Sequence, residues 1–422
     1  MAPDAGLAAC TMMGSNPASE SYDLSFLVHH HDVNDISTNS WGIDSCQYID
    51  ASTDCPFECP NVGSNWCPCD VCDGDDWSSG DLGRNCENTV VDYCYYFFED
   101  DVTPCLELDH YFVQCGFGQL SSTAHDRLED GVINGRNGLG MVLVFASGNE
   151  FRKGDDVNFE GYLNSRFTIS VGAVGQDLKH ARYSSSGAPV FLSAPGGDWE
   201  NYHLIFAAKP LSMGFQDNCG DAGAGTSYAA PLVAGVVALV LEANPSLTWR
   251  DVQGVLQATA SRPHEDEEDQ WITNAAGVKH SYRYGFGLVD AYAAVVQAAA
   301  WSTWGSEITL VRATVSDETL LDYDGAEHWV ASTSDAFGSA DFVIESVSVY
   351  VTIEHPRRGD LRIELERNGV TSLLTDDKLE FGTRYTHHKY TTLRHWGERA
   401  DDGAFTLRVV DRRAGSGDDD DL

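Results

Sequence analysis

The segment "GAGTSYAAPLVAG" (223–235) places Ser227 between a Gly-Thr step and an Ala-Ala-Pro step. A run of small apolar residues follows, which predicts a buried helix over 227–243 with the serine at its N-terminus. We expect Pro231 in the first turn of this helix, where its missing N–H costs little. A serine hydroxyl is a poor nucleophile until a neighbouring base takes its proton. The segment therefore predicts a nucleophile whose base lies elsewhere in the protein.

Two unbroken apolar runs of strand length precede this helix. They are "MVLVFASGNE" (141–150), which closes in Ser-Gly-Asn, and "FTISVGAVG" (167–175). Helical patterns cover 120–140 and 246–260. Continuous β-branched strands that alternate with helices are typical of a parallel sheet buried on both faces. We therefore expect an α/β domain over residues 1–300.

The pattern of the chain changes after residue 300. The segments "VIESVSVYVTIEH" (343–355), "DLRIELER" (360–367) and "FTLRVVD" (405–411) alternate apolar and polar residues. Such alternation, with glycine-containing turns between the runs, is typical of antiparallel strands. We expect a second domain over 301–422, folded as a β-sandwich.

The overall charge limits the classes of partner. Of 422 residues, 26 are Lys or Arg and 65 are Asp or Glu, which gives a formal net charge of −39. Nucleic acids and anionic membrane surfaces are poor partners for this charge, whereas cationic peptides and calcium suit it. No apolar run approaches the ~20 residues of a membrane span. We expect protein or peptide partners, no nucleic acid and no membrane span.

Ten of the twelve cysteines fall within residues 46–115, a segment rich in acidic residues. An even, dense set of cysteines is typical of a disulfide-stapled insertion made in an oxidising compartment. Zinc is the alternative, because Cys67, Cys69 and Cys72 are closely spaced. That spacing does not recur as a second pair, so the disulfide interpretation is favoured.

Three short segments carry residues suited to acyl-transfer chemistry. "GTSYAAP" (225–231) puts the serine at a helix N-terminus, where backbone N–H groups favour developing negative charge. "FASGN" (145–149) places Asn149 just past a buried strand, so that its amide is able to donate to an oxyanion. "NSWG" (39–42) offers an extended edge against which a peptide backbone pairs.

Together these segments closely resemble the subtilase family of serine proteases, and within it the kexin and furin-like proprotein convertases. The segments 241–253, 284–291 and 355–365 ("LEANPSLTWRDVQ", "YGFGLVDA" and "HPRRGDLRIEL") are similar to that group as well. The resemblance implies a subtilisin-like parallel sheet flanked by helices, followed by a jelly-roll-like P (Homo B) domain. It covers nearly all of the chain except 46–115, which we expect to be an insertion.

The resemblance also implies roles for individual residues. Ser227 would be the nucleophile and Asn149 the oxyanion donor. Two segments would line the main chain of the substrate: Ser40, Trp41 and Gly42, and Ala146, Ser147 and Gly148. Glu160 stands where the family has an aspartate that binds the residue before the scissile bond, so cleavage after basic residues is a hypothesis.

Calcium is the cofactor that the resemblance implies. Asp155 falls at a calcium-ligand position, and Asp44 is the acidic residue that follows "NSWG". Ser185, however, stands where a calcium-binding glutamate is usual. We therefore expect a calcium site at Asp155 and Asp44 that has fewer carboxylates than its relatives.

The base and its aspartate are expected outside this sequence. In the family both precede a segment like "APDAGLAA" (2–9), and the histidine belongs to a His-Gly-Thr motif that does not occur here. The cysteine that would pair with Cys219 is expected upstream of Met1, and the P domain is expected to continue past 411. The sequence also opens without a signal-peptide pattern. We therefore expect a chain that is incomplete at both ends and unstable alone.

Two functions are consistent with these observations. The first is a serine endopeptidase of the subtilisin/kexin class that processes proteins or pro-proteins in the secretory pathway or outside the cell. The second is a catalytically inactive homologue that binds peptides or proteins. In either case residues 46–115 are a candidate surface for docking a partner.

Overall fold

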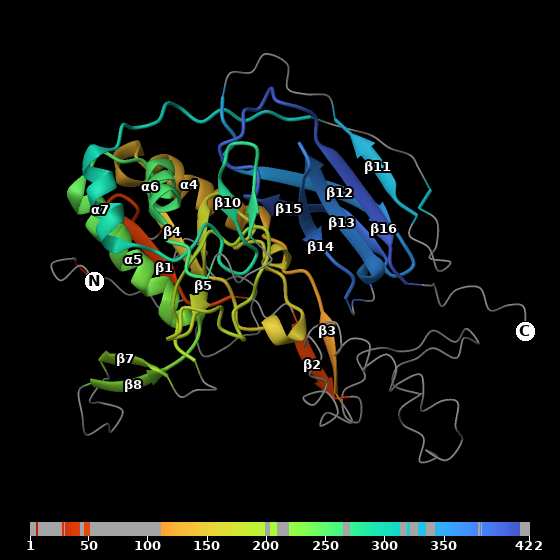
Figure 1. The fold of residues 1–422 in the computed structure, drawn as a ribbon, viewed down its shortest axis with the longest axis horizontal. Helices are drawn as coiled ribbons and strands as arrows, with labels where there is room; N and C mark the ends of the chain where they lie inside the picture. Colours follow the sequence, from red (N-terminus) through yellow and green to blue (C-terminus); the bar gives the residue numbers. More distant parts are fainter. Residues whose placement is uncertain are drawn as a thin grey trace, which may run out of the picture.

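The computed structural model describes residues 6, 28, 30–42, 46–50, 111–198, 203–208, 219–264, 271–312, 319–320, 328–334, 342–378, 380 and 382–413. Two bodies lie side by side, an α/β domain with the described residues up to Ala300 and a β domain with the C-terminal part of the chain (Figure 1). The fold expected from the sequence is confirmed in both.

A four-stranded parallel sheet forms the centre of the α/β domain. Its strand order is β1-β4-β5-β6, with β1 at one edge of the described sheet. Every residue of β4 and β5 is buried, as the continuous apolar runs predict. The strands are β1 (Ile36–Asn39), β4 (Val142–Ala146), β5 (Thr168–Val174) and β6 (Leu192–Pro195).

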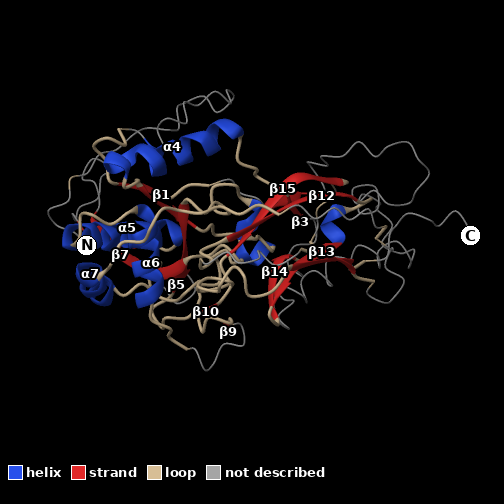
Figure 2. Cartoon of the chain, turned by 90° about the horizontal axis from the view of Figure 1, so that it is seen from above, coloured by secondary structure: helices blue, strands red, loops and turns tan. Residues whose placement is uncertain are grey.

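Helices cover both faces of this sheet (Figure 2). Val142 and Val144 of β4 pack in the core with α5, whereas Leu143 and Phe145 pack in a second core with α4. This alternation explains why a strand of the sheet carries no polar side. The helices are α4 (Ser122–Gly138), α5 (Thr226–Ala243), α6 (Trp249–Thr259) and α7 (Ala291–Ala300).

Helix α5 carries Ser227 near its N-terminus. It begins at Thr226, one residue before the predicted start, so Pro231 is its sixth residue. The prediction that Pro231 lies in the first turn is therefore wrong, because that residue lies in the second turn. There its missing N–H deprives the Ser227 carbonyl, four residues earlier, of a helical partner. Among the described helices α5 alone has the length and apolarity of a membrane span, and its apolar side chains pack on the sheet.

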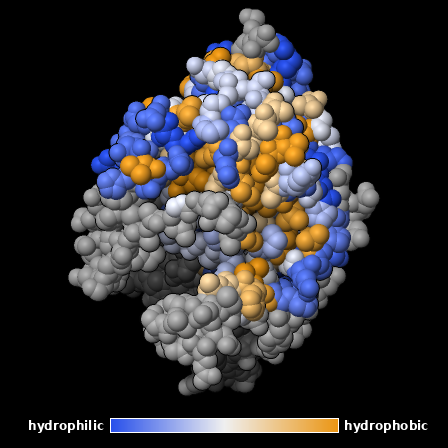
Figure 3. Space-filling view, turned by 90° about the vertical axis from the view of Figure 1, so that its left-hand side faces the viewer, coloured by the Kyte–Doolittle hydropathy of each residue, from blue (hydrophilic) through white to orange (hydrophobic). Residues whose placement is uncertain are grey.

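Apolar surface gathers at the end of the molecule that carries α5 and α7 (Figure 3). Tyr292 and Val296, both on α7, are among the exposed large apolar side chains, at 82% and 54%. The outer edge of β1 meets no other strand of the described part of the chain.

A disulfide closes the two ends of the predicted insertion. Cys46 and Cys115 lie opposite each other in an antiparallel ladder of β2 (Cys46–Asp50) and β3 (Tyr111–Cys115). The prediction of a disulfide is confirmed at this pair, although the ladder itself was not expected. The other eight cysteines of the insertion, including the zinc alternative at Cys67, Cys69 and Cys72, lie outside the described residues.

Smaller elements connect the sheet to the rest of the domain. Two short ladders pair β7 with β8 and β9 with β10, and two 3-10 helices follow β4. Their bounds are β7 (Ile205–Ala208), β8 (Cys219–Gly223), β9 (Ile272–Thr273), β10 (Lys279–His280), η2 (Phe151–Lys153) and η3 (Val157–Phe159).

The second domain is a β-sandwich. One antiparallel sheet has the order β11-β16-β13-β14 and the other pairs β12 with β15. Ile363 and Leu365 share a core with Tyr385 and Tyr390. The strands are β11 (Val330–Thr333), β12 (Val347–Glu354), β13 (Leu361–Arg367), β14 (Val370–Thr375), β15 (Arg384–Thr392) and β16 (Thr406–Asp411), with the 3-10 helix η5 (Arg358–Asp360) between β12 and β13.

The two domains share a packed interface. Leu393 and Trp396, which follow β15, belong to the same apolar core as the helices of the α/β domain. The side-chain amide of Asn158 donates to the Leu374 carbonyl at 3.2 Å, while its oxygen accepts from the Thr391 N–H at 2.8 Å. The β-sandwich is thereby fixed to the 3-10 helix η3 of the α/β domain.

Candidate active site

Ser227 lies on the first turn of α5, beside the end of β1. Its hydroxyl donates to the Ser40 carbonyl at 3.3 Å, and the Ser40 hydroxyl donates to the Ser227 carbonyl at 3.0 Å. The second bond satisfies the carbonyl that Pro231 leaves without a helical partner. Among the described histidines, none accepts a hydrogen bond from Ser227 Oγ.

Asn149 lies next to this turn and is held by Thr226. Its Oδ1 accepts from the Thr226 N–H at 2.9 Å and from the Thr226 hydroxyl at 3.0 Å. Because Oδ1 must accept these bonds, the exposed Nδ2 is left to donate elsewhere. Sequence reasoning missed Thr226, although its place beside the nucleophile in "GTS" was a usable signal.

Two N–H donors flank one open position at the helix N-terminus. A Cβ atom on Gly225 would lie 3.6 Å from Asn149 Oδ1, 3.8 Å from Asn149 Nδ2 and 3.8 Å from the Ser227 nitrogen. Gly225 leaves this position empty, and its φ of 150° disfavours other residues there. Two N–H groups beside one open position at a helix N-terminus suit an oxygen that gains negative charge.

Ser40, Trp41 and Gly42 follow β1 and were expected to line the main chain of the substrate. The Trp41 ring packs edge-on against Phe145 and Tyr162, with centroids 5.9 and 5.2 Å apart. Its Nε1–H donates to Asn39 Oδ1 at 3.2 Å. The Trp41 side chain thus supports the core, which leaves the backbone of Ser40–Gly42 as the part that is able to meet a peptide.

Of the three predicted residues at the end of β4, two point inward. Ala146 is 7% exposed and Ser147 is fully buried. The Ser147 N–H donates to the Val171 carbonyl and its hydroxyl to the Ser185 carbonyl, at 3.0 and 3.2 Å. Gly148 alone is half-buried. A role for all three in binding the substrate stays a prediction.

The structure brings Glu160 and Gly42 together. A Cβ atom on Gly42 would lie 2.7 Å from Glu160 Oε2, so the carboxylate lies directly against the Gly42 backbone. Glu160 follows η3 and is 5% exposed. A buried carboxylate beside the expected substrate edge is suited to a cationic side chain.

Of the two residues expected to hold calcium, the structure describes only Asp155, and a calcium site there stays a prediction. Asp155 Oδ2 accepts from the Ser185 hydroxyl at 2.7 Å, and burial raises the pKa of the Asp155 carboxyl. Calcium takes six to eight oxygen ligands, several of them carboxylates. No group of three ligating side chains in the described residues includes Asp155. Asp44 lies outside the described residues.

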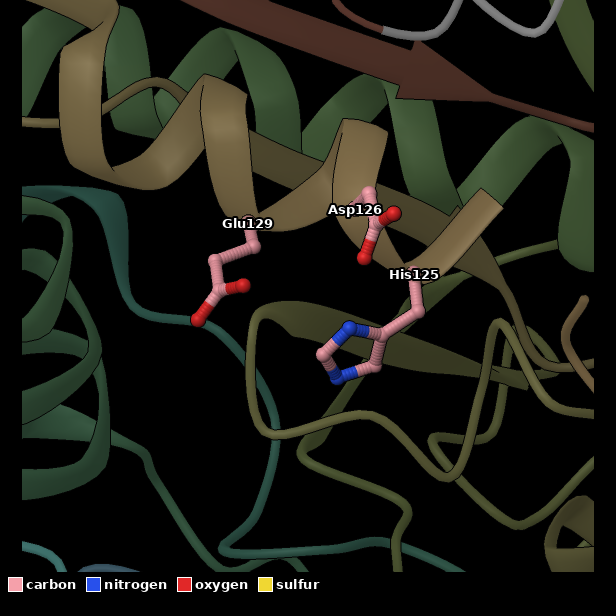
Figure 4. A group of neighbouring side chains, drawn as sticks. All are labelled: His125, Asp126 and Glu129. Carbon is pink, nitrogen blue, oxygen red and sulfur yellow. The ribbon is translucent and has the colours of Figure 1, made fainter. Parts of the chain in front are cut away.

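One group of potential ligands does lie on α4, where His125, Asp126 and Glu129 extend from the same stretch of helix (Figure 4). Their ligand atoms lie within 4.8 Å of one another. Asp126 is exposed and the other two are half-buried, and the His125 ring packs edge-on against Phe167. Neighbouring polar residues on an exposed helix face need no ion to explain them.

Lys378 reaches this region from the β-sandwich. Its ammonium donates to the Gly154 carbonyl at 3.2 Å, in the segment between Asn149 and Glu160. The two residues are 224 positions apart, so no sequence spacing could have predicted the contact.

Fold and site together define a protein with a subtilisin-like α/β domain, a serine at a helix N-terminus and an attached β-sandwich. A family model described as "Subtilase family" matches residues 1–287, and one described as "Proprotein convertase P-domain" matches residues 344–420. The chain belongs to the subtilase family, and the resemblance to proprotein convertases is confirmed.

Curated relatives include proprotein convertase subtilisin/kexin type 6 of Rattus norvegicus, 37% identical over 302 residues, which are 70% of this chain and 31% of the relative. Type 7 of Homo sapiens is 35% identical over 295 residues, 68% of this chain and 37% of the relative. The chain thus spans about a third of the length of these relatives.

A solved structure supports the fold. The serine protease of Aeromonas sobria superposes with a TM-score of 0.62 at 21% identity, covering 71% of this chain and 63% of that one.

Proposed function

We propose that this chain carries the nucleophile and oxyanion hole of a subtilisin/kexin-class serine endopeptidase that processes proteins or pro-proteins. The observation that supports it most is that the side-chain amide of Asn149 and the Ser227 nitrogen both lie beside the position left open by Gly225. A serine that merely caps a helix does not require an amide held beside it by Thr226.

In the proposed mechanism, Ser227 Oγ attacks the carbonyl carbon of the substrate and its proton passes to a general base. The carbonyl oxygen becomes an oxyanion that accepts from Asn149 Nδ2 and the Ser227 N–H. Collapse breaks the peptide bond, and the amine leaves with the proton from the base. Water then hydrolyses the acyl-enzyme. The family resemblance assigns the base to a histidine of a His-Gly-Thr motif.

Cleavage after a basic residue is the proposed specificity. Glu160 would pair with a lysine or arginine side chain that enters beside Gly42, while the backbone of Ser40–Gly42 pairs with the substrate main chain. The net charge of −39 would add long-range attraction for cationic peptides.

The compartment and the partner surface are proposals of the same kind. The Cys46–Cys115 disulfide supports an oxidising compartment, either the secretory pathway or the extracellular space. Residues 46–115, which begin four positions after Gly42, are the proposed surface for contact with a substrate or partner protein. Deleting 47–114 and measuring partner capture would test that role.

The test uses the full-length gene product and a fluorophosphonate probe, which labels a serine only when a base activates it. We expect labelling in the parent protein and none in Ser227→Ala, with Asn149→Ala reduced but folded. A peptide library should then show cleavage after Arg or Lys. Absence of both labelling and cleavage, with peptide binding retained, would instead establish an inactive peptide-binding homologue.

A further inference from the structure

The chain returns from the insertion through residues 115–119, here called the return segment, and this segment runs beside Glu160. The Gly118 N–H donates to the Phe159 carbonyl at 2.8 Å, and the Gly118 carbonyl accepts from the Gly161 N–H at 2.7 Å. Gly118 and Glu160 thus lie opposite each other as in a parallel ladder. One residue of the return segment therefore holds the backbone on both sides of Glu160.

The position of the Glu160 carboxylate depends on this backbone. Glu160 is the C-terminal cap of η3, and its N–H reaches the Val157 carbonyl only at 3.4 Å, which is long for a backbone hydrogen bond. A Cβ atom on Gly42 would lie 2.7 and 3.0 Å from the two carboxylate oxygens of Glu160. On the N-terminal side of Glu160 the shorter hydrogen bond comes from Gly118, so the return segment helps to set how the carboxylate lies against Gly42.

Phe117 packs the return segment onto both domains. Its ring meets the Phe159 ring of η3 edge-on, with centroids 4.5 Å apart. On β15 of the β-sandwich, the rings of Tyr385 and His388 also meet Phe117 edge-on, at 5.3 and 4.7 Å. Aromatic pairs in this arrangement attract each other beyond the area that they bury. The return segment is thereby packed against η3 and β15 at once.

Gln119 adds a polar contact to the same histidine. Its Nε2 lies 2.9 Å from Nδ1 of His388. His388 is 2% exposed, and burial, with the nearby Arg358, lowers the pKa of His388 to about 4. The ring is therefore neutral near pH 7, and a neutral imidazole is able to accept at Nδ1 from an amide. This contact joins the β-sandwich to the residue next to Gly118.

From these contacts, and resting on the proposed function, we propose that Gln119 is a positioning residue for the Glu160 carboxylate. Gln119 touches no substrate. It anchors the return segment on His388, and Gly118 of that segment holds the backbone of Glu160. The preference for a basic residue before the scissile bond therefore depends on the β-sandwich as well as on the α/β domain.

The first experiment measures kcat/KM of the full-length gene product on two matched peptides, with Arg or norleucine before the scissile bond. We expect Gln119→Leu to lower kcat/KM for the Arg peptide about fivefold, a part of the loss from removing the Glu160 charge, because the carboxylate is less well placed. The value for the norleucine peptide should not change. Gln119 is exposed, so the variant should fold. Equal losses on both peptides would overturn the proposal.

Gln253→Leu is the matched control. It also removes a side-chain amide that joins distant segments, since Gln253 Nε2 donates to the Arg166 carbonyl at 3.2 Å. Because this contact does not involve the return segment, the preference for Arg over norleucine should stay at the parent value. A loss of preference equal to that of Gln119→Leu would overturn the proposal.

Further variants test whether the effect passes through Glu160 and His388. In a Glu160→Gln background, Gln119→Leu should cause no further loss of preference, and a further fivefold loss would overturn the proposal. His388→Leu should lose preference as Gln119→Leu does. His388→Asn keeps an acceptor near the position of Nδ1 and should retain most of the preference.

A binding measurement gives a readout that does not depend on catalysis. The probe is p-aminobenzamidine, a small amidinium able to pair with a carboxylate, and its binding is followed by fluorescence. We expect its Kd to rise about tenfold in Glu160→Gln and about fivefold in Gln119→Leu. Gln253→Leu should bind as the parent does. An unchanged Kd in Gln119→Leu would overturn the proposal.

These measurements also separate the inference from the proposed function. If the parent neither hydrolyses peptides nor reacts with the fluorophosphonate, the proposed function fails, and the Kd of p-aminobenzamidine still decides whether Gln119 positions Glu160. If the parent cleaves after Arg but Gln119→Leu keeps both the peptide preference and the Kd, only the inference about Gln119 fails.

Discussion

Ser40 and Ser227 exchange hydrogen bonds across the junction of β1 and α5: each hydroxyl donates to the carbonyl of the other residue, at 3.0 and 3.3 Å. The Ser227 carbonyl is available for this bond because Pro231 has no N–H to donate to it. The edge expected to bind substrate is thereby tied to the turn that carries the nucleophile.

This exchange predicts a coupling between Ser40 and Pro231. Ser40→Ala should lower the free energy of unfolding by about 1 kcal/mol, because it leaves the Ser227 carbonyl without a partner. In a Pro231→Ala background the new N–H of residue 231 donates to the Ser227 carbonyl. Ser40→Ala should then lower the free energy of unfolding much less. A double-mutant cycle from urea unfolding measures the difference, and strictly additive costs would contradict the coupling.

Thr226 should act on the rate through Asn149. Thr226→Val keeps the shape of the side chain but removes its hydroxyl, which lies 3.0 Å from Asn149 Oδ1 and 3.2 Å from the Gly148 carbonyl oxygen. We expect kcat of the full-length enzyme to fall about tenfold with little change in KM, since the oxyanion donor becomes less well oriented. Thr226→Ser keeps the hydroxyl and serves as the control; a loss equal to that of the valine variant would exclude orientation by this hydrogen bond.

Glu160 should determine the preference for a basic residue. Glu160→Gln keeps the size of the side chain and removes its charge, so kcat/KM for substrates with Arg before the scissile bond should fall at least about tenfold. Matched substrates with a neutral residue at that position should be affected little. An unchanged ratio between the two substrates would assign specificity to other residues.

His280 should make the fold sensitive to acid. Burial, with the nearby Arg394, lowers the pKa of His280 to about 3, and its Nε2–H faces the Val190 carbonyl at 2.9 Å. The unfolded chain binds a proton at this residue below about pH 6.5, whereas the folded chain stays neutral down to about pH 3. The contribution of neutral His280 to stability is therefore complete above pH 6.5 and declines as the pH falls.

The variant His280→Gln tests whether the contribution of His280 to stability declines as the pH falls. It keeps an N–H donor for Val190 but does not titrate. The gap in unfolding free energy between parent and variant should shrink by about 2 kcal/mol between pH 7.5 and pH 5. Urea unfolding at the two pH values gives the gap, with circular dichroism to verify that both proteins start folded. A gap that stays constant would contradict a buried neutral imidazole.

Elements whose residues are contiguous in the sequence could be predicted from their local pattern. The buried strand that ends before Asn149 was predictable because every residue of β4 is apolar. The place of Ser227 was predictable because its motif is contiguous. Pro231 was misplaced because the start of α5 depends on the Asn149 amide, which satisfies the Thr226 N–H from 77 residues away.

Contacts between segments that are distant in the sequence could not be predicted from it. Nothing in the residues around Lys378 indicates that its ammonium reaches Gly154, because the contact exists only once the β-sandwich has docked. The bond between Ser185 and Asp155 was equally hidden, although the serine in place of a glutamate had already marked the calcium site as poor in carboxylates.

The Cys46–Cys115 bridge also bears on how this protein can change over generations. The Cα atoms of Cys46 and Cys115 are 4.0 Å apart although 69 positions separate them. The insertion therefore leaves and rejoins the domain at neighbouring points, as a tight turn does. Substitution, growth or loss of the sequence between the two cysteines therefore leaves the strand register untouched. The parallel sheet is therefore able to stay constant over generations while the sequence between the two cysteines changes.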